Sequence, residues 1–139
     1  MQTFMKSIRI LLTILAFFLF ITAFLGGITL IANLYAPPLD SLQGSIFTNF
    51  TIPGLALSLL VGGSALTAAI LLLRRSKYAT LFAAAAGIVI MFFEFVEVMI
   101  IGSPAGPARF MQIFYFGLGT AIEIAALGTW FLGLRMETV

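Results

Sequence analysis

Four long apolar stretches, separated by short polar segments, dominate the pattern of this chain. Each stretch reaches the roughly 20 residues that a helix needs to cross the hydrocarbon core of a bilayer. The pattern therefore predicts an all-α membrane protein whose residues 1–139 form a single domain. The domain is a bundle of four transmembrane helices, expected at about residues 8–34, 52–73, 78–101 and 110–134.

The composition supports this class and narrows the chemistry. Hydrophobic residues make up 62% of the 139 positions and charged residues only 9%, which excludes an ordinary soluble domain. The net charge of +2 calls for no nucleic-acid partner. Because the chain has neither cysteine nor histidine, disulfides, thiolate metal sites and haem ligation by histidine are excluded, and we expect no cofactor or metal.

The basic residues predict the orientation of the helices. Six of the seven fall on one side of the four expected spans, and they are Lys6, Arg9, Arg74, Arg75, Lys77 and Arg135. The third loop carries only Arg109 and the first loop carries none. The positive-inside rule then places both termini in the cytoplasm. This charge bias argues against a dual-topology protein, so any homodimer is expected to be parallel.

The first loop, residues 35–51, is polar but not uniformly so. Apolar side chains recur along it at intervals typical of a short amphipathic turn, at Leu39, Leu42, Ile46, Phe47 and Phe50. We expect the loop to lie in the outer membrane interface as a short helix, or to fold over the mouth of the bundle as a lid.

Small residues at four-residue spacing predict where helices approach closely. Helix two carries Gly54, Ser58 and Gly62, and helix four carries Gly117, Ala121, Ala125, Thr129 and Gly133. Packing within one bundle is the preferred interpretation of these stripes. A homodimer seam is the alternative.

Three carboxylates lie inside the apolar stretches and are the candidate site. A charge near the bilayer centre costs roughly 2.5 to 3.5 kcal/mol or more, so such residues usually face the protein interior and often mark an ion, proton or ligand site. Glu94 and Glu97 are three residues apart and share one helix face, while Glu123 is expected near the middle of helix four. Arg109 is the candidate ion-pair partner of Glu97.

Other polar positions extend this candidate site. We expect a cavity that opens to the outer face, with Thr22, Thr29 and Asn33 of helix one and Gln112 and Thr120 of helix four around the three acids. Helices three and four are joined by a short loop, so they are expected to be antiparallel neighbours whose polar faces meet. A purely structural role, in which the acids hold protons and form internal hydrogen bonds, remains open at this point.

Two elements of the sequence resemble a family of small bacterial four-helix integral membrane proteins. Residues 45–57 read S-I-F-T-N-F-T-I-P-G-L-A-L, similar to the pattern S-P-F-x-D-Y-x-I-P-G-L. Val96, Glu97 and Val98, followed by Gly102, resemble a second element that often has Gln at the Glu position. The resemblance implies a bacterial inner-membrane protein of the same topology, without an activity to carry over.

The favoured function is a multi-pass protein of the bacterial inner membrane that binds a cation, a proton or a small amphipathic ligand through its acids, with transport as the consequence. The alternative is an accessory or assembly subunit that docks another membrane protein. An enzyme is disfavoured, because the sequence has no phosphate-binding loop after a strand and no histidine to pair with a nucleophilic serine. Acid–base chemistry by the carboxylates on a lipid substrate stays open.

Overall fold

A computed structural model describes residues 1–131 of the chain as an all-helical protein, with no strand in that range. The first span is α1 (Gln2–Ile31), and the second is continuous from α2 (Thr51–Leu55) through η2 (Ala56–Val61) to α3 (Gly62–Leu73). The third and fourth spans are α4 (Ala79–Ile101) and α5 (Pro107–Phe131). The loop after α1 contains a 3₁₀ turn, η1 (Leu39–Leu42).

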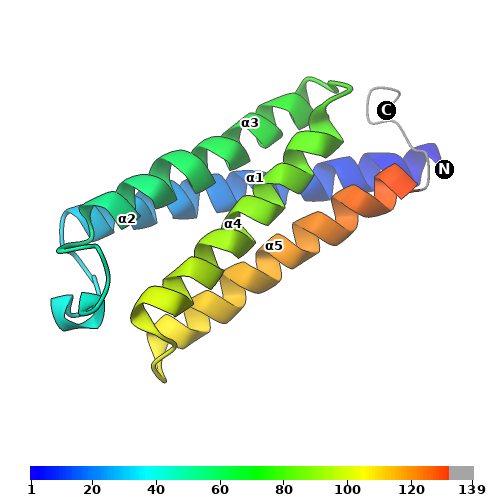
Figure 1. Ribbon diagram of the computed structural model, residues 1–139. Helices are drawn as coiled ribbons and strands as arrows, with labels where there is room; N and C mark the ends of the chain where they lie inside the picture. Colours follow the sequence, from blue (N-terminus) through cyan, green and yellow to red (C-terminus); the bar gives the residue numbers. More distant parts are fainter. Residues whose placement is uncertain (132–139) are drawn as a thin grey trace.

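The four spans form two antiparallel hairpins (Figure 1). One pairs α1 with α2–α3, and the other pairs α4 with α5. The hairpins converge where the N-terminus and the turn between α3 and α4 lie, which we call the terminal end. They diverge toward the opposite end, which carries η1 and the turn at residues 102–106 and which we call the loop end (Figure 1).

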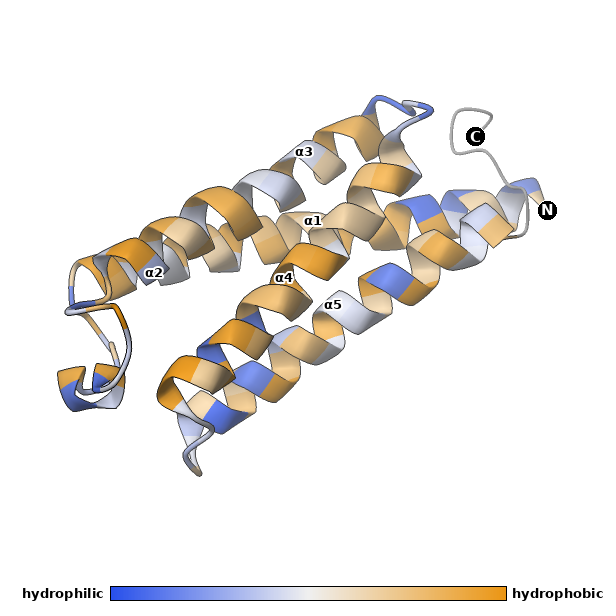
Figure 2. Ribbon diagram, viewed as in Figure 1, coloured by the Kyte–Doolittle hydropathy of each residue, from blue (hydrophilic) through white to orange (hydrophobic). Residues whose placement is uncertain are grey.

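All four spans are long and apolar enough to cross a membrane. Their outer surfaces are covered by large apolar side chains such as Leu60, Phe92 and Ile113. Figure 2 shows hydrophobic residues over most of the four helices, with hydrophilic residues at the α3–α4 turn and in patches on α4 and α5. The predicted helical bundle with four membrane-length spans is confirmed, and the four spans indicate a multi-pass membrane protein.

The helix ends differ in part from the predicted ones. The first helix starts at Gln2 rather than near residue 8, because Lys6 and Arg9 are compatible with a helix that continues beyond the apolar stretch. It ends three residues early, where Asn33 takes a left-handed conformation (φ 57°) and terminates the helix. The last helix starts at Pro107 rather than residue 110, since proline suits the first turn of a helix. Residues 132–134, with Gly133, and Arg135 lie outside the described residues.

Small residues allow the two helices of each hairpin to pack closely. A Cβ atom on Gly27 of α1 would collide with Ser58 and with the carbonyl of Gly54, and the Ser58 hydroxyl donates a hydrogen bond to the Phe24 carbonyl (3.1 Å). In the second hairpin, a Cβ on Gly119 would lie 2.9 Å from the Gly87 carbonyl oxygen. In both hairpins, the short distance between the two helices therefore depends on glycine.

The two predicted stripes of small residues differ in how far they pack within the bundle. Gly54 and Ser58 are buried against α1, so the stripe of helix two packs within the bundle, as preferred. On α5, Gly117 and Ala121 are exposed, and a Cβ on Gly117 would meet no atom within 4 Å. Ala125, by contrast, is half-buried against the core and Thr129 has no exposed surface, so the later part of this stripe packs within the bundle. Gly119 and Ala126 complete the packing face of α5.

The second span contains a segment of π-helix that the sequence did not predict, over Ala56–Val61. Such a segment widens one turn and is often found at functional sites. It places Ser58 and Val61 against the rest of the bundle, where both are buried. The side chains of Ala56 and Leu57, at its start, face the cavities described below.

Candidate functional site

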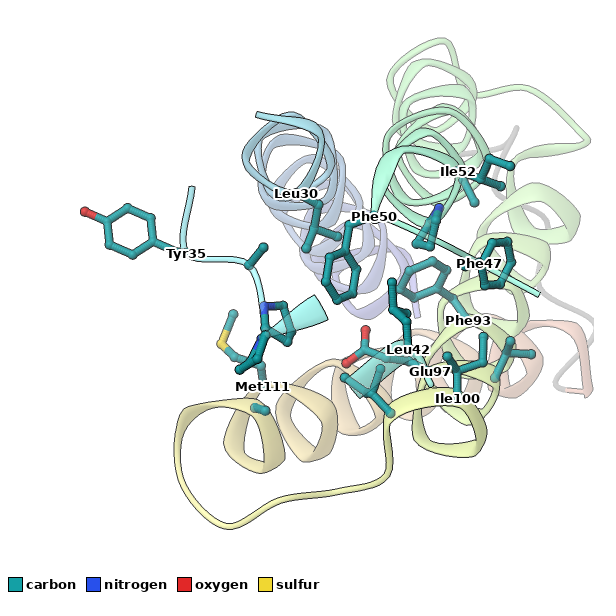
Figure 3. Close-up of a pocket in the computed structure, with 18 of the residues that line it drawn as sticks. Leu30, Tyr35, Leu42, Phe47, Phe50, Ile52, Phe93, Glu97, Ile100 and Met111 are labelled. Atoms are coloured by element: carbon teal, nitrogen blue, oxygen red, sulfur yellow. The ribbon is translucent and has the colours of Figure 1, made fainter. Parts of the chain in front are cut away.

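The divergence of the two hairpins leaves a cavity of about 590 Å³ at the loop end, which we call the outer cavity. All four spans contribute to its wall, together with the loop that contains η1. The side chains that line it are almost all apolar or aromatic, among them Leu30, Leu42, Phe47, Phe50, Phe93, Ile100 and Met111. Figure 3 shows these side chains converging on one space. Of the five apolar residues predicted in the first loop, Leu42, Phe47 and Phe50 line the cavity, whereas Leu39 and Ile46 are exposed and do not.

Glu97 is the single ionisable acid or base, tyrosine apart, that residues 1–131 contribute to the wall of the outer cavity. Its carboxylate lies among apolar side chains (Figure 3). One carboxylate oxygen, Oε1, accepts a hydrogen bond from Gln112 Nε2 (3.1 Å). The other oxygen makes no hydrogen bond within residues 1–131, so it is free to meet a ligand.

A second, smaller cavity of about 120 Å³, the inner cavity, lies beside the first. Its wall includes Thr22 of α1, Glu94 and Glu97 of α4, and Tyr115 of α5. Glu97, Phe93 and Met111 line both cavities, so these three residues form the partition between them.

Glu94 belongs to the inner cavity alone. Only 6% of its surface is exposed, and its carboxyl group makes no hydrogen bond to any other residue in the described part of the chain. Buried polar groups are normally paired with protein or with ordered water. Because a cavity of this size has room for a few water molecules, water is the available partner of Glu94.

Gln112 fixes the position of Glu97. The Gln112 side chain is 4% exposed, and its Nε2 donates both to Glu97 and to the Gly102 carbonyl (3.0 Å). A carbonyl can only accept, so the amide nitrogen must be the atom that faces Gly102. Gln112 therefore ties the turn after α4 to the carboxylate, while its own Oε1 is buried without a partner in the described residues.

Arg109 does not reach Glu97. Its side chain is exposed, and both Nε (3.0 Å) and Nη2 (2.6 Å) donate to the Ser103 carbonyl. The predicted ion pair is thus replaced by a local bond in the turn before α5. Among the described residues that line either cavity, none is a lysine or an arginine.

Glu123 lies apart from the other two acids and lines neither cavity. Its Oε2 would lie 3.0 Å from a Cβ on Gly87, which is seven residues before Glu94 on α4. Seven residues of helix correspond to about 10 Å, so Glu123 lies two turns nearer the terminal end. Its Oε2 is buried and has no hydrogen-bond partner within residues 1–131. Thr120, one turn away, donates to the Phe116 carbonyl and lies 3.9 Å from the Met91 sulfur.

The polar residues of α1 are also split between the inner cavity and positions outside both cavities. Thr22 lines the inner cavity, although its hydroxyl donates to the Phe18 carbonyl in the preceding turn (2.8 Å). Thr29 bonds to the Gly26 carbonyl and lines neither cavity. Asn33 is exposed and ends α1. The structure therefore brings together Thr22, Glu94, Glu97 and Gln112, and leaves Thr29, Asn33, Arg109, Thr120 and Glu123 outside this group.

Sequence reasoning missed the aromatic and sulfur-containing residues of the site. Phe93 precedes Glu97 by four residues, and Tyr115 follows Gln112 by three, so both lie on the acidic and polar helix faces that the spacing had already identified. That spacing was the signal that could have found them. Met111, adjacent to Gln112 in sequence, had no comparable signal.

No protein-family model matches this chain, and neither a curated protein nor a solved structure shows significant similarity to it. The resemblance noted from residues 45–57 and 96–102 accordingly rests on those residues alone.

Proposed function

We propose that the protein is a multi-pass protein of a bacterial inner membrane, with both termini in the cytoplasm, that binds a small amphipathic cation in the outer cavity and transports it. The observation that carries this proposal is the position of Glu97, one carboxylate in an otherwise apolar cavity. The apolar wall would take up the hydrophobic body of the ligand, and Glu97 would face its charge.

The size and chemistry of the outer cavity support this ligand class. Cavities of roughly 300 to 1,000 Å³ accommodate drug-sized molecules, and the outer cavity of about 590 Å³ lies within that range. Three aromatic side chains, Phe47, Phe50 and Phe93, stand in its wall. Aromatic faces attract organic cations as well as apolar groups. An anion would instead meet a carboxylate and, among the residues that the structure describes, no basic side chain.

Binding of tetraphenylphosphonium to the purified protein in detergent tests the proposal. We expect saturable binding that weakens about a hundredfold in Glu97→Gln, because the uncharged amide leaves the buried cation without its counter-charge. Glu123→Gln is the matched control and should bind as the wild type does, since Glu123 lines neither cavity. A folded wild-type protein that shows no saturable binding, or equal loss in both variants, would exclude Glu97 as the ligand site.

A second candidate function is an accessory subunit that docks another membrane protein. It is favoured by α5, where the small residues Gly117 and Ala121 are exposed. Small residues let a helix of another subunit approach α5 closely. The two functions differ in behaviour, because a transporter moves its substrate when reconstituted alone in vesicles and an accessory subunit is inert alone.

A further inference from the structure

Within residues 1–131, the two cavities together present two carboxylates and no lysine or arginine to compensate them. We propose that this site exchanges one proton for each lipophilic monocation that it binds, with Glu97 as the group that meets the cation and Glu94 as the group through which the proton leaves. This inference rests on the proposed function, since it names the coupling of the same site.

Charge balance inside the bundle is the first argument. Each uncompensated charge in a space of low dielectric constant costs several kcal/mol, so the state of lowest cost is the neutral one. No lysine or arginine lines either cavity among the described residues, and Arg109 is bonded to the Ser103 carbonyl. The empty site is therefore neutral when both carboxyl groups carry a proton. With a monocation bound, it is neutral when one of them has lost its proton.

The position of the partition decides which acid meets the cation. Glu97 faces the outer cavity, where the cation binds, and Glu94 faces only the inner cavity. The O–H bond that breaks on binding is thus that of Glu97. The electron pair stays on its carboxylate, the proton passes to solvent, and the cation takes the place of the positive charge that leaves.

The bound cation blocks the route by which this proton could leave through the outer cavity. Once an apolar ligand fills the outer cavity, the polar space that remains beside Glu97 is the inner cavity with Glu94 and Thr22. Glu94 is only 6% exposed and makes no hydrogen bond to another described residue, so it can release the proton that it holds and take up the proton of Glu97 in its place. An amide at this position fills the same space but cannot carry the proton.

The groups that face the two acids add few competing titrations. From α5, Tyr115 and Met111 line the inner cavity, and Gln112 bonds to Glu97. From α1 and η2, Thr22 and Leu57 face it, and neither is titratable. In the outer cavity, Tyr35 is the titratable residue contributed by the first loop. The two carboxyls are therefore the acidic groups that the two cavities share.

Counting protons on addition of tetraphenylphosphonium tests the exchange. This cation has no titratable proton, so any proton that reaches a pH indicator in weakly buffered solution comes from the protein. We expect one proton per cation bound, and binding that strengthens with rising pH. Cation binding without proton release would overturn the exchange and leave the proposed function standing, whereas absence of binding would count against the proposed function itself.

The role of Glu94 is tested by the rate of release after rapid mixing. Glu94→Gln should keep the cation affinity and the proton count, but release the proton about tenfold more slowly, because a proton-transfer group has been removed. Glu94→Asp keeps a carboxyl and should restore most of the rate. Release by Glu94→Gln at the wild-type rate would overturn the assigned route.

A variant that keeps both acids gives a test that is independent of any effect of Glu94→Gln on folding. Leu57→Phe enlarges a side chain that lines the inner cavity without contributing to the outer one. We expect it to slow proton release while tetraphenylphosphonium still binds. An unchanged release rate in this variant would show that the inner cavity is not the route.

Discussion

The contacts inside the two hairpins differ from the contacts between them. Inside each hairpin, glycines bring the helices together at Gly27 with Gly54 and at Gly87 with Gly119. Between the hairpins, contact is concentrated at the terminal end, and the loop end encloses the two cavities (Figure 1). The contacts inside the hairpins and at the terminal end are therefore assigned to stability, and the cavities at the loop end are assigned to binding.

The difference explains how a chain this short can keep buried acids without losing its core. Fully buried alanines and leucines, such as Leu19, Ala65, Leu72 and Ala83, form the continuous core of the bundle. Glu94 and Glu97 stand on α4 beyond this core, where the helices have already separated and a cavity is available. The acids do not have to be fitted into a close-packed interior, and the predictions below test this separation.

The largest effect is expected for the glycine contact inside the first hairpin. Gly27→Ala should destabilise the protein by about 2 to 3 kcal/mol, because the new Cβ would collide with Ser58 and the Gly54 carbonyl. Unfolding in mixed dodecylmaltoside and sodium dodecyl sulfate, followed by circular dichroism, measures this change. Gly63→Ala is the matched control, since a Cβ there meets nothing within 4 Å, and it should be neutral or stabilising. Equal destabilisation by both substitutions would contradict the assigned contact.

A smaller loss is expected for overpacking the core near the terminal end. Ala83 has no exposed surface, and Ala83→Leu should cost about 2 kcal/mol in the same unfolding assay, because the core has no space for three more carbon atoms. A variant as stable as the wild type would show that the hairpins are loosely packed at both ends, and the contrast between the ends would be lost.

The same substitution in the outer cavity should act on binding instead. Ala56 lines the outer cavity, so Ala56→Leu places its added atoms in open space and should change stability by less than about 0.5 kcal/mol. We expect tetraphenylphosphonium to bind about tenfold more weakly as the cavity shrinks, measured by equilibrium dialysis. If Ala56→Leu proved as destabilising as Ala83→Leu while binding stayed unchanged, the cavity would not be the ligand site.

The sequence predicted the helices well because membrane spans are encoded in length and hydrophobicity, both of which are local. Lys6 and Arg9 did not end the first helix, and Arg9 lies against the bundle, where its Nη1 donates to the Leu72 carbonyl at the end of α3 (3.5 Å). The start of α5 at Pro107 was missed, although proline at a first turn was an available signal. The π-helical segment at Ala56–Val61 had no local signal of this kind.

The site was predicted in part, and the limit was the register between helices. The spacing of Glu94 and Glu97 placed them on one face, which needs only the geometry of one helix. The depth of Glu123 relative to them depends on how α4 and α5 align, and the turn at residues 102–106 sets that alignment so that Glu123 lies beside Gly87. The ion pair of Arg109 failed for a related reason, because the Ser103 carbonyl in this turn was nearer than Glu97.

The smallest effect is expected for a single hydrogen bond across the first hairpin. Ser58 donates to the Phe24 carbonyl on α1, and Ser58→Ala should cost about 0.6 kcal/mol, the usual size of an interhelical hydrogen bond in a membrane. Ser64→Ala is the matched control, because Ser64 donates within its own helix to the Val61 carbonyl, and its loss should be close to zero. A loss at Ser58 much larger than at Ser64 would mean that the hydroxyl, and not only the glycines, holds α1 against η2. Equal small losses at both serines would show that close backbone approach at Gly27 and Gly54 alone holds α1 against η2. The contrast between this tight hairpin and the open space between the hairpins would then come from glycine packing and not from a hydrogen bond.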